Sequence, residues 1–158
     1  MELEKKFLHQ LIDSMKIARL ALINRKNLPE AIPIVFGRHK DILFSPVDGK
    51  PKRSSNLARI KNIEANSNTM LLFDYYCKDW EKLWWLRLVC VSQVVTDPPD
   101  TEFYQTILKE KYEQYQVTRL SNEPYESTFI TFNINSVRWW GFLGKHTLEK
   151  WLARNPLV

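Results

Sequence analysis

The most basic stretch of the sequence is a loop, SPVDGKPKRSS, which runs from Ser45 to Ser55 and also carries several hydroxyl groups. Its cations are Lys50, Lys52 and Arg53. If Ser54 or Ser55 opens a helix, the free backbone N–H groups there add partial positive charge. These groups together suit an anion such as a phosphate. A solvated basic turn is the alternative interpretation, and the GxxxxGK[ST] pattern of a nucleotide-binding P-loop is absent.

A second stretch, DYYCKDWEKLWWLRLV from Asp74 to Val89, combines flat aromatic rings with a cation. Trp80, Trp84 and Trp85 precede Arg87, and such surfaces suit stacking against a planar ring such as a nucleobase or a flavin. Side chains alternate along a strand, so Trp84 and Trp85 are expected on opposite faces of a sheet, with at most one in the core. The other would lie at a ligand, at a subunit interface or in solvent. Structural use of both, one in the core and one in a dimer contact, is the alternative.

Other reactive side chains form no pattern of a known catalytic or metal site. The three histidines are far apart and lack HExxH, and Cys77 and Cys90 lack the CxxC spacing of a zinc site. No serine stands in a GxSxG context. The clustered acids Asp74, Asp79 and Glu81 are expected to be solvated rather than paired for glycosidase chemistry. The sequence therefore gives little support to hydrolysis or to metal catalysis.

Length and composition favour one ordinary domain. The chain has 158 residues, 44% of them hydrophobic, so we expect a single domain over 1–158 with its own core. The formal charge of +5 favours an anionic partner but does not identify it. The charged N-terminal segment lacks an apolar signal core, and no stretch is apolar for the length of a membrane span. These features predict a soluble, cytoplasmic protein with no membrane partner.

The first half of the chain predicts a helix followed by a meander of three strands. Apolar residues recur every three or four positions from Phe7 to Met15, as in an amphipathic helix. The β-rich runs 18–24, 31–37 and 41–46 follow, joined by short connections. Pro33 has no N–H to donate, so its strand should lie at an edge or carry a bulge.

The second half predicts a helix after Ser54 or Ser55, strands over 69–76 and about 83–95, a helix around Phe103 to Leu108, and a last strand. That strand alternates from Ile130 and runs into Arg138, Trp139 and Trp140, and a short helix ends the chain. About six strands without a strand–helix–strand alternation fit a mainly β, α+β fold: a small antiparallel barrel with short flanking helices.

The ordered set of motifs resembles the pyridoxamine-5′-phosphate-oxidase-like split-barrel flavoproteins, and more narrowly their deazaflavin (factor 420)-dependent branch. The matching stretches are ARLALI, AIPIVFG, SPVDGKPKRSSNLARIKNIEAN, LLFDYYCKDWEKLWWLR, KYEQY and VRWWG, which together cover most of Ala18 to Gly141. The combination of VDGKPKR with DWEKLWWLR carries most of the resemblance. It implies a six-stranded split β-barrel of the FMN-binding type, forming a homodimer with two cofactor sites at the subunit interface.

The resemblance also implies roles for particular residues. The loop after the third strand would hold the cofactor phosphate through Ser45, Lys50, Lys52 and Arg53, helped by Ser54 or Ser55. The first two strands would line the ring system through Arg19, Ala21, Pro33 and Val35. The interface aromatics would be among Trp84, Trp85 and Trp139, and Arg87 would contact the ring edge or the phosphate. The cofactor would be FMN or the deazaflavin coenzyme, whose ring transfers hydride, so no side chain need be a nucleophile.

Two stretches depart from the family pattern. The first hairpin turn reads NRKNLPEA where relatives commonly have a glycine, and VCVSQVV stands where a strand glycine is frequent. A bulkier residue at the strand position would narrow the ring pocket.

The leading hypothesis is an oxidoreductase acting on an unidentified small organic substrate, and the alternative is a non-catalytic flavin-binding or carrier protein. Specific nucleic-acid binding is disfavoured, because the aromatic residues lie in apolar strands apart from the basic loop.

Overall fold

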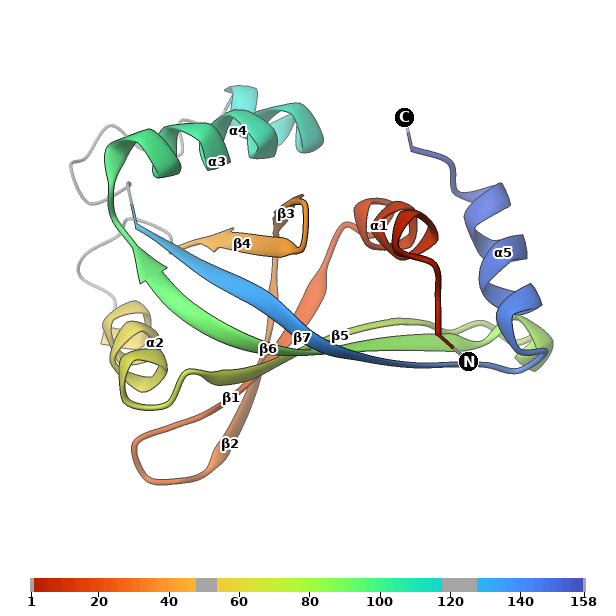
Figure 1. Cartoon of the computed structure of the whole chain (residues 1–158), viewed down its shortest axis with the longest axis horizontal. Coiled ribbons are helices and arrows are strands. Elements are labelled where there is room, and N and C mark those ends of the chain that lie inside the picture. The colour runs from red at the N-terminus through yellow and green to blue at the C-terminus, as the bar shows by residue number, and fades with distance from the viewer. Residues whose placement is uncertain (1, 48–53, 118–127, 158) are drawn as a thin grey trace.

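The computed structural model describes residues 2–47, 54–117 and 128–157. Its centre is one antiparallel seven-stranded sheet in the order β2-β1-β5-β6-β7-β4-β3 (Figure 1). The strands are β1 (Ala18–Ile23), β2 (Pro29–Ile34), β3 (Gly37–His39), β4 (Ile42–Pro46), β5 (Asn68–Tyr75), β6 (Trp84–Val95) and β7 (Phe129–Gly141). The helices are α1 (Lys5–Asp13), α2 (Ser54–Ala65), η1 (Trp80–Lys82), α3 (Pro98–Lys111), α4 (Gln114–Val117) and α5 (Lys145–Arg154).

A two-residue connection makes the sheet curl. β2 and β3 are the two edge strands, at opposite ends of the strand order, yet only Val35 and Phe36 separate them along the chain. A connection this short forces the two edges to meet, so the sheet bends into a half-barrel. Phe36 is fully buried at this seam, and its ring packs edge-on against Phe73 of β5 with centroids 5.3 Å apart.

The main core fills the inside of the half-barrel. The inward residues of β1, β5 and β6 pack against α1, whose Leu8, Leu11 and Ile12 are buried as the amphipathic spacing predicted. At the far end of the long strands, Trp84 packs against Trp151 of α5 with ring centroids 5.0 Å apart. In Figure 1, α1, α3 and α5 all lie above the long central strands, and α2 lies below them at one end.

A smaller core lies between α3 and the edge of the barrel. It consists of Phe44, Leu108, Tyr112 and Phe129. The Tyr112 hydroxyl accepts a hydrogen bond from the Phe36 N–H at 3.1 Å and lies 3.0 Å and 2.9 Å from the carbonyl oxygens of Phe36 and Lys16. One side chain thus joins the end of α3 to the β2–β3 connection and to the segment before β1.

The structure corrects two expectations about the strands. There are seven strands rather than six, because the single β-rich run predicted over 31–37 is broken at Val35 and Phe36 into β2 and β3. The predicted three-strand meander is wrong, since β3 and β4 pair at the opposite edge of the sheet from β1 and β2. The expectation for Pro33 is confirmed: β2 is an edge strand. None of the helices in the described part of the chain is long and apolar enough to span a membrane.

Candidate functional site

The outer face of the sheet carries the polar and aromatic side chains that the core excludes. Burial alternates along β6, so Trp84 is buried at 1% exposure whereas Trp85 and Arg87 lie on the other face and are half-buried. This confirms that the two adjacent tryptophans point to opposite sides of the sheet. We call the side opposite the core, over β1, β5, β6 and β7, the outer face.

Three arginines share one level of this outer face. Arg87 of β6 pairs with Arg138 of β7 on one side and with Leu72 of β5 on the other. Leu72 in turn pairs with Arg19 of β1. Residues paired across antiparallel strands project from the same face, with neighbouring Cβ atoms about 5 Å apart. The guanidinium groups therefore form a row across four strands, interrupted only by Leu72.

Of these three arginines, Arg87 is the one with a buried nitrogen that lacks a hydrogen bond in the described part of the chain. Its Nε atom is buried and has no hydrogen-bond partner among the described residues. Its guanidinium carbon lies 5.3 Å from the ring centroid of Trp85, within the range of a cation–π contact. A buried guanidinium N–H without an acceptor is costly, and arginine cannot escape the cost by losing its proton. The Arg87 Nε–H group is therefore a polar group that the described part of the chain leaves unsatisfied.

The other charges on the outer face leave an excess of positive charge there. Arg19 donates a short hydrogen bond to the carboxylate of Asp74 on the neighbouring strand, and both side chains are substantially exposed. Neither Arg87 nor Arg138 has an ion-pair partner within the described ranges. Asp74 pairs with Arg19, so among the residues that the structure describes two positive charges on the row have no counter-charge. An anionic group would be attracted to the β6–β7 part of the face.

Aromatic side chains border the arginine row on one side. Trp85 pairs with Asp74 on β5 and with Trp140 on β7, so the two tryptophans are cross-strand neighbours on the outer face. Trp140 is 41% exposed and lies near Phe142, with ring centroids 6.3 Å apart. Smaller apolar residues, Ala21, Met70 and Val89, pair with one another on the opposite side of the row. The face thus offers a flat apolar surface on each side of a band of cations.

Five of the residues that the sequence predicted to bind the cofactor lie on this face. They are Arg19, Ala21, Pro33, Trp85 and Arg87, with Pro33 paired directly to Arg19 across β1 and β2. The other nominated residues of the sheet lie elsewhere. Trp84 is in the core, Trp139 packs against the core from the inner face, and Val35 packs against the smaller core. Ser45 is buried, and its hydroxyl donates to the Val35 carbonyl at 2.7 Å.

Most of the segment that was predicted to hold the cofactor phosphate lies outside the described residues. Lys50, Lys52 and Arg53 fall in the undescribed segment, and α2 begins at Ser54, as expected for a helix opened by Ser54 or Ser55. The body of α2 packs against β6 and β1, and Asn62 of this helix accepts a hydrogen bond from the Arg25 N–H at 3.2 Å. The helix is thus fixed at the end of the sheet where the β1–β2 turn lies.

Sequence reasoning missed three residues of the outer face: Asp74, Arg138 and Trp140. Of the adjacent pair Trp139 and Trp140, Trp139 packs against the core whereas Trp140 is exposed. The alternation that separated Trp84 from Trp85 could have separated this pair as well. No sequence signal aligned Arg138 with Arg87, because an irregularity in the β6–β7 pairing next to Val89 shifts the register by one residue.

The described residues offer binding groups rather than reactive ones on this face. They contain no cluster of histidine, cysteine, aspartate or glutamate side chains suited to a metal ion. The outer face supplies guanidinium donors and indole rings, which bind anions and planar rings.

Comparison with known proteins identifies the fold. No protein-family model and no curated protein sequence matches the chain. Among solved structures, a protein of the pyridoxinephosphate oxidase family from Clostridium acetobutylicum matches with a TM-score of 0.63 at 17% identity, covering 88% of this chain and 91% of that one. An FAD-binding protein from Mesorhizobium loti has a TM-score of 0.62 at 13% identity, covering 87% and 94%.

A heme-binding protein from Mycobacterium smegmatis is also similar, with a TM-score of 0.68 at 10% identity. The match covers 89% of this chain and 55% of that one. Identities this low establish the architecture and leave the ligand open, since the similar proteins are described by different ligands. The chain therefore has the split-barrel fold that these proteins share.

Proposed function

We propose that the protein is a flavin- or deazaflavin-dependent oxidoreductase that binds its cofactor against the outer face, between two copies of the chain. The observation that carries this proposal is the buried, unpaired Nε of Arg87 beside the Trp85 ring, on a face with two unbalanced positive charges. A molecule with a flat ring system and an anionic group satisfies both features. Similarity to split-barrel proteins described as FAD-binding and as pyridoxinephosphate oxidase relatives supports the same ligand class.

The residues of the chain would act by binding and orientation. Arg87 and Arg138 would donate to the anionic or carbonyl oxygens of the ligand, and Trp85 would cover one side of a planar ring. Lys50, Lys52 and Arg53, which precede α2 in the sequence, would hold the phosphate. A bound flavin or deazaflavin supplies hydride transfer at its ring. The small side chains of Ala21 and Pro33 would let the ring lie close to the β1–β2 backbone.

A second copy of the chain is part of this proposal because one chain leaves the face half open. The side chain of Arg19 is 53% exposed and Trp140 is 41% exposed. Closing such a face excludes water and strengthens each charge-assisted hydrogen bond to a ligand. We therefore expect a homodimer whose interface and cofactor sites are continuous.

The first test is the identity of any small molecule that the purified protein carries. The protein is denatured, and the released molecules are identified by mass spectrometry. FMN, FAD or a deazaflavin in near-stoichiometric amount would support the proposal and select the redox partner for activity assays. If none is found, titration with FMN and with the deazaflavin follows, and failure to bind either one would contradict it.

A double substitution tests the phosphate loop separately. Lys52→Ala with Arg53→Ala should weaken cofactor binding at least tenfold, because each lost charge-assisted bond costs about 1.5–3 kcal/mol. Substituting two exposed cations on another element, Lys150→Ala with Arg154→Ala in α5, makes the same change in net charge and is the control. Unchanged affinity in the loop variant would remove the loop from the site.

Turnover separates the enzyme from the alternative, a non-catalytic flavin carrier. A bound cofactor that is reduced and reoxidised repeatedly in the presence of a nicotinamide donor and a panel of acceptors identifies an enzyme. A cofactor that stays bound but is inert toward every donor and acceptor in the panel favours the carrier.

A further inference from the structure

Lys111, the last residue of α3, has a buried side chain that the proposed cofactor site does not use. Its Nζ atom is inaccessible to solvent and has no hydrogen-bond partner among the described residues. The atom lies 3.5 Å from the centroid of the Phe36 ring and 5.5 Å from that of Tyr112. A lysine normally extends its ammonium into water, so an amine held against two aromatic rings is unusual.

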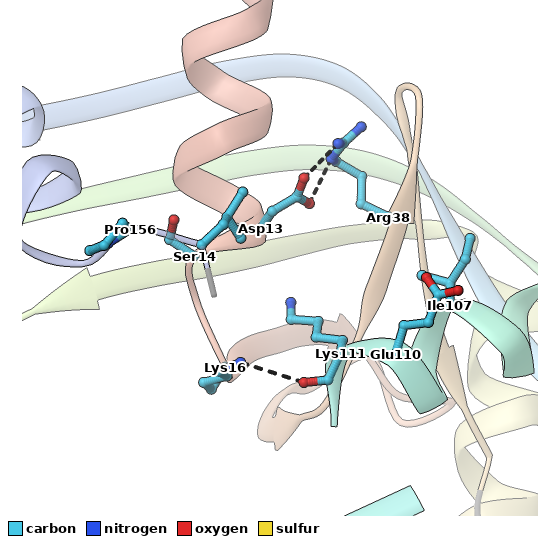
Figure 2. A pocket seen from close by; sticks show the side chains of 9 residues that line it. Asp13, Ser14, Lys16, Arg38, Ile107, Glu110, Lys111 and Pro156 are labelled. Carbon is cyan, nitrogen blue, oxygen red and sulfur yellow. Dashed lines mark hydrogen bonds and ion pairs between the residues drawn. The ribbon is translucent and has the colours of Figure 1, made fainter. Parts of the chain in front are cut away.

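A pocket of about 280 Å³ lies beside this amine. Figure 2 shows the Lys111 side chain pointing from the end of α3 toward the side of the pocket formed by Asp13 and Arg38. α1, β3, α3 and the chain after α5 all contribute to its walls, the last through Pro156 and Leu157. A cavity of this size accommodates a small organic molecule but not a flavin.

None of the described charged groups around the pocket forms an ion pair with the amine. Both carboxylate oxygens of Asp13 are engaged by Arg38, from Nε to Oδ1 at 2.8 Å and from Nη2 to Oδ2 at 2.6 Å. Lys16 contributes a further positive charge and donates to the Lys111 carbonyl at 3.5 Å. Glu110, the other acid that lines the pocket, is exposed on α3.

Burial and these neighbours determine the protonation of the amine. Burial lowers the pKa of Lys111 to about 7, with smaller lowering effects from Lys16 and Arg38 and an opposing effect from Asp13. At pH 7 an amine with this pKa is about half neutral, whereas an ordinary lysine is neutral in roughly one molecule of 2,500. The neutral amine is the nucleophilic form.

We propose that the side chain of Lys111 turns from the Phe36 ring into this pocket, where its amine acts as a nucleophile and forms an imine with a small bound carbonyl compound. The Nζ lone pair attacks the carbonyl carbon, a C–N bond forms, and the carbonyl oxygen takes up a proton. Loss of that oxygen as water, with the remaining proton from nitrogen, leaves a C=N bond. The step needs no oxidant or reductant, and it uses a part of the molecule separate from the outer face.

The test is competition between two lysines of the same helix. The intact protein is treated at pH 7 with a limiting amount of acetaldehyde and sodium cyanoborohydride, which reduces any imine to a stable ethylamine. Peptide mass spectrometry then compares Lys111 with Lys109, an exposed residue on the same helix. Lys111 should be modified at least tenfold faster, and the preference should disappear in the denatured protein. Equal rates in the folded protein would overturn the proposal.

The pH profile and a substitution complete the experiment. The rate at Lys111 should rise and level off within about one pH unit above 7, while the rate at Lys109 should keep rising towards pH 10. A profile for Lys111 that follows that of Lys109 would contradict the proposal. Lys111→Arg keeps the positive charge but cannot form an imine, so the fast modification should vanish while other sites are unaffected. The wild-type competition remains decisive if this variant does not fold.

Discussion

Arg87 and Lys111 each have a buried side-chain nitrogen that lacks a hydrogen-bond partner in the described part of the chain, and each side chain lies against an aromatic ring. The two sites differ in shape. Arg87 stands in the middle of a broad, half-open sheet face between Trp85 and Arg138, whereas Lys111 closes one side of a small pocket between α1, β3 and α3.

The difference in side chain decides what each site can do. A guanidinium stays charged at every relevant pH. The free-energy cost of the buried Arg87 nitrogen is therefore offset only when a hydrogen-bond acceptor or an anion from another molecule binds there. An amine can release its proton. Lys111 can therefore lower the free-energy cost of burial by becoming neutral, and the neutral amine is a nucleophile. A buried nitrogen without a hydrogen-bond partner thus indicates a binding site at Arg87 and a reactive group at Lys111.

The strongest test of this contrast removes the cations of the outer face. Arg87→Ala with Arg138→Ala should weaken FMN or deazaflavin binding by about 10–100-fold, because at least one charge-assisted hydrogen bond of about 1.5–3 kcal/mol is lost. Fluorescence titration measures the affinity. Lys111→Arg, titrated in parallel, should bind the cofactor like the wild type. A loss of similar size in both variants would show that the two sites are not separate.

The next largest effect concerns Tyr112, which joins the end of α3 to the β2–β3 connection. Tyr112→Phe should lower the free energy of unfolding by about 1–3 kcal/mol, because the Phe36 N–H loses its acceptor and the carbonyls of Lys16 and Phe36 lose the single O–H that they share. Urea unfolding followed by fluorescence measures this change. The matched control is Tyr76→Phe, since Tyr76 is 71% exposed and should tolerate the change. If both variants unfold alike, the Tyr112 contacts contribute little.

A stability effect of comparable size, with a characteristic pH dependence, is expected at Lys111 itself. Its pKa is about 7 in the folded protein against 10.5 when unperturbed, so the unfolded state binds more protons between these values and stability rises with pH there. Lys111→Met has no proton to bind here and should be more stable than the wild type by up to about 4 kcal/mol at pH 7. The gain should shrink to nothing by about pH 10.5. A gain independent of pH would mean that the amine is not buried as a partly neutral group.

The smallest effect comes from the ion pair at the end of the arginine row. Asp74→Asn frees Arg19 and should strengthen cofactor binding about twofold at low salt, since exposed pairs are worth about 0.2–1 kcal/mol. The difference should disappear at high ionic strength, where surface charges are screened. A weakening instead would indicate that Asp74 itself contacts the ligand.

Local patterns in the sequence predicted most of the elements. The amphipathic spacing from Phe7 gave α1, and the alternation of Trp84 and Trp85 separated a core residue from an exposed one. The sequence could not say which of the two faces inward, because that depends on how β6 pairs and curls. The break at Val35 and Phe36 was also hidden, since both residues favour strands by type.

The surroundings of the unpaired nitrogens of Arg87 and Lys111 are formed by elements that are distant in the sequence. Arg87 and Arg138 are paired only through the β6–β7 register and its irregularity, which no local pattern encodes. Lys111 looks like an ordinary helix-ending lysine, of the kind that favours the carboxyl end of a helix dipole. Its burial is created by α1, β3 and the chain after α5, which are distant in sequence. Local periodicity finds elements, whereas sites of this kind need the tertiary fold.

The connection between β2 and β3 also acts as a short tether. Three Cα steps separate Ile34 from Gly37, so the two strands can move at most roughly 11 Å apart at this point even with the link fully extended. Fraying of one sheet edge must therefore pull on the other, although the two edges stand at opposite ends of the strand order. Amide hydrogens of β2 and β3 should exchange through one shared opening event. Residues inserted between Val35 and Phe36 would separate that event into two, whereas insertions in the β1–β2 turn would not.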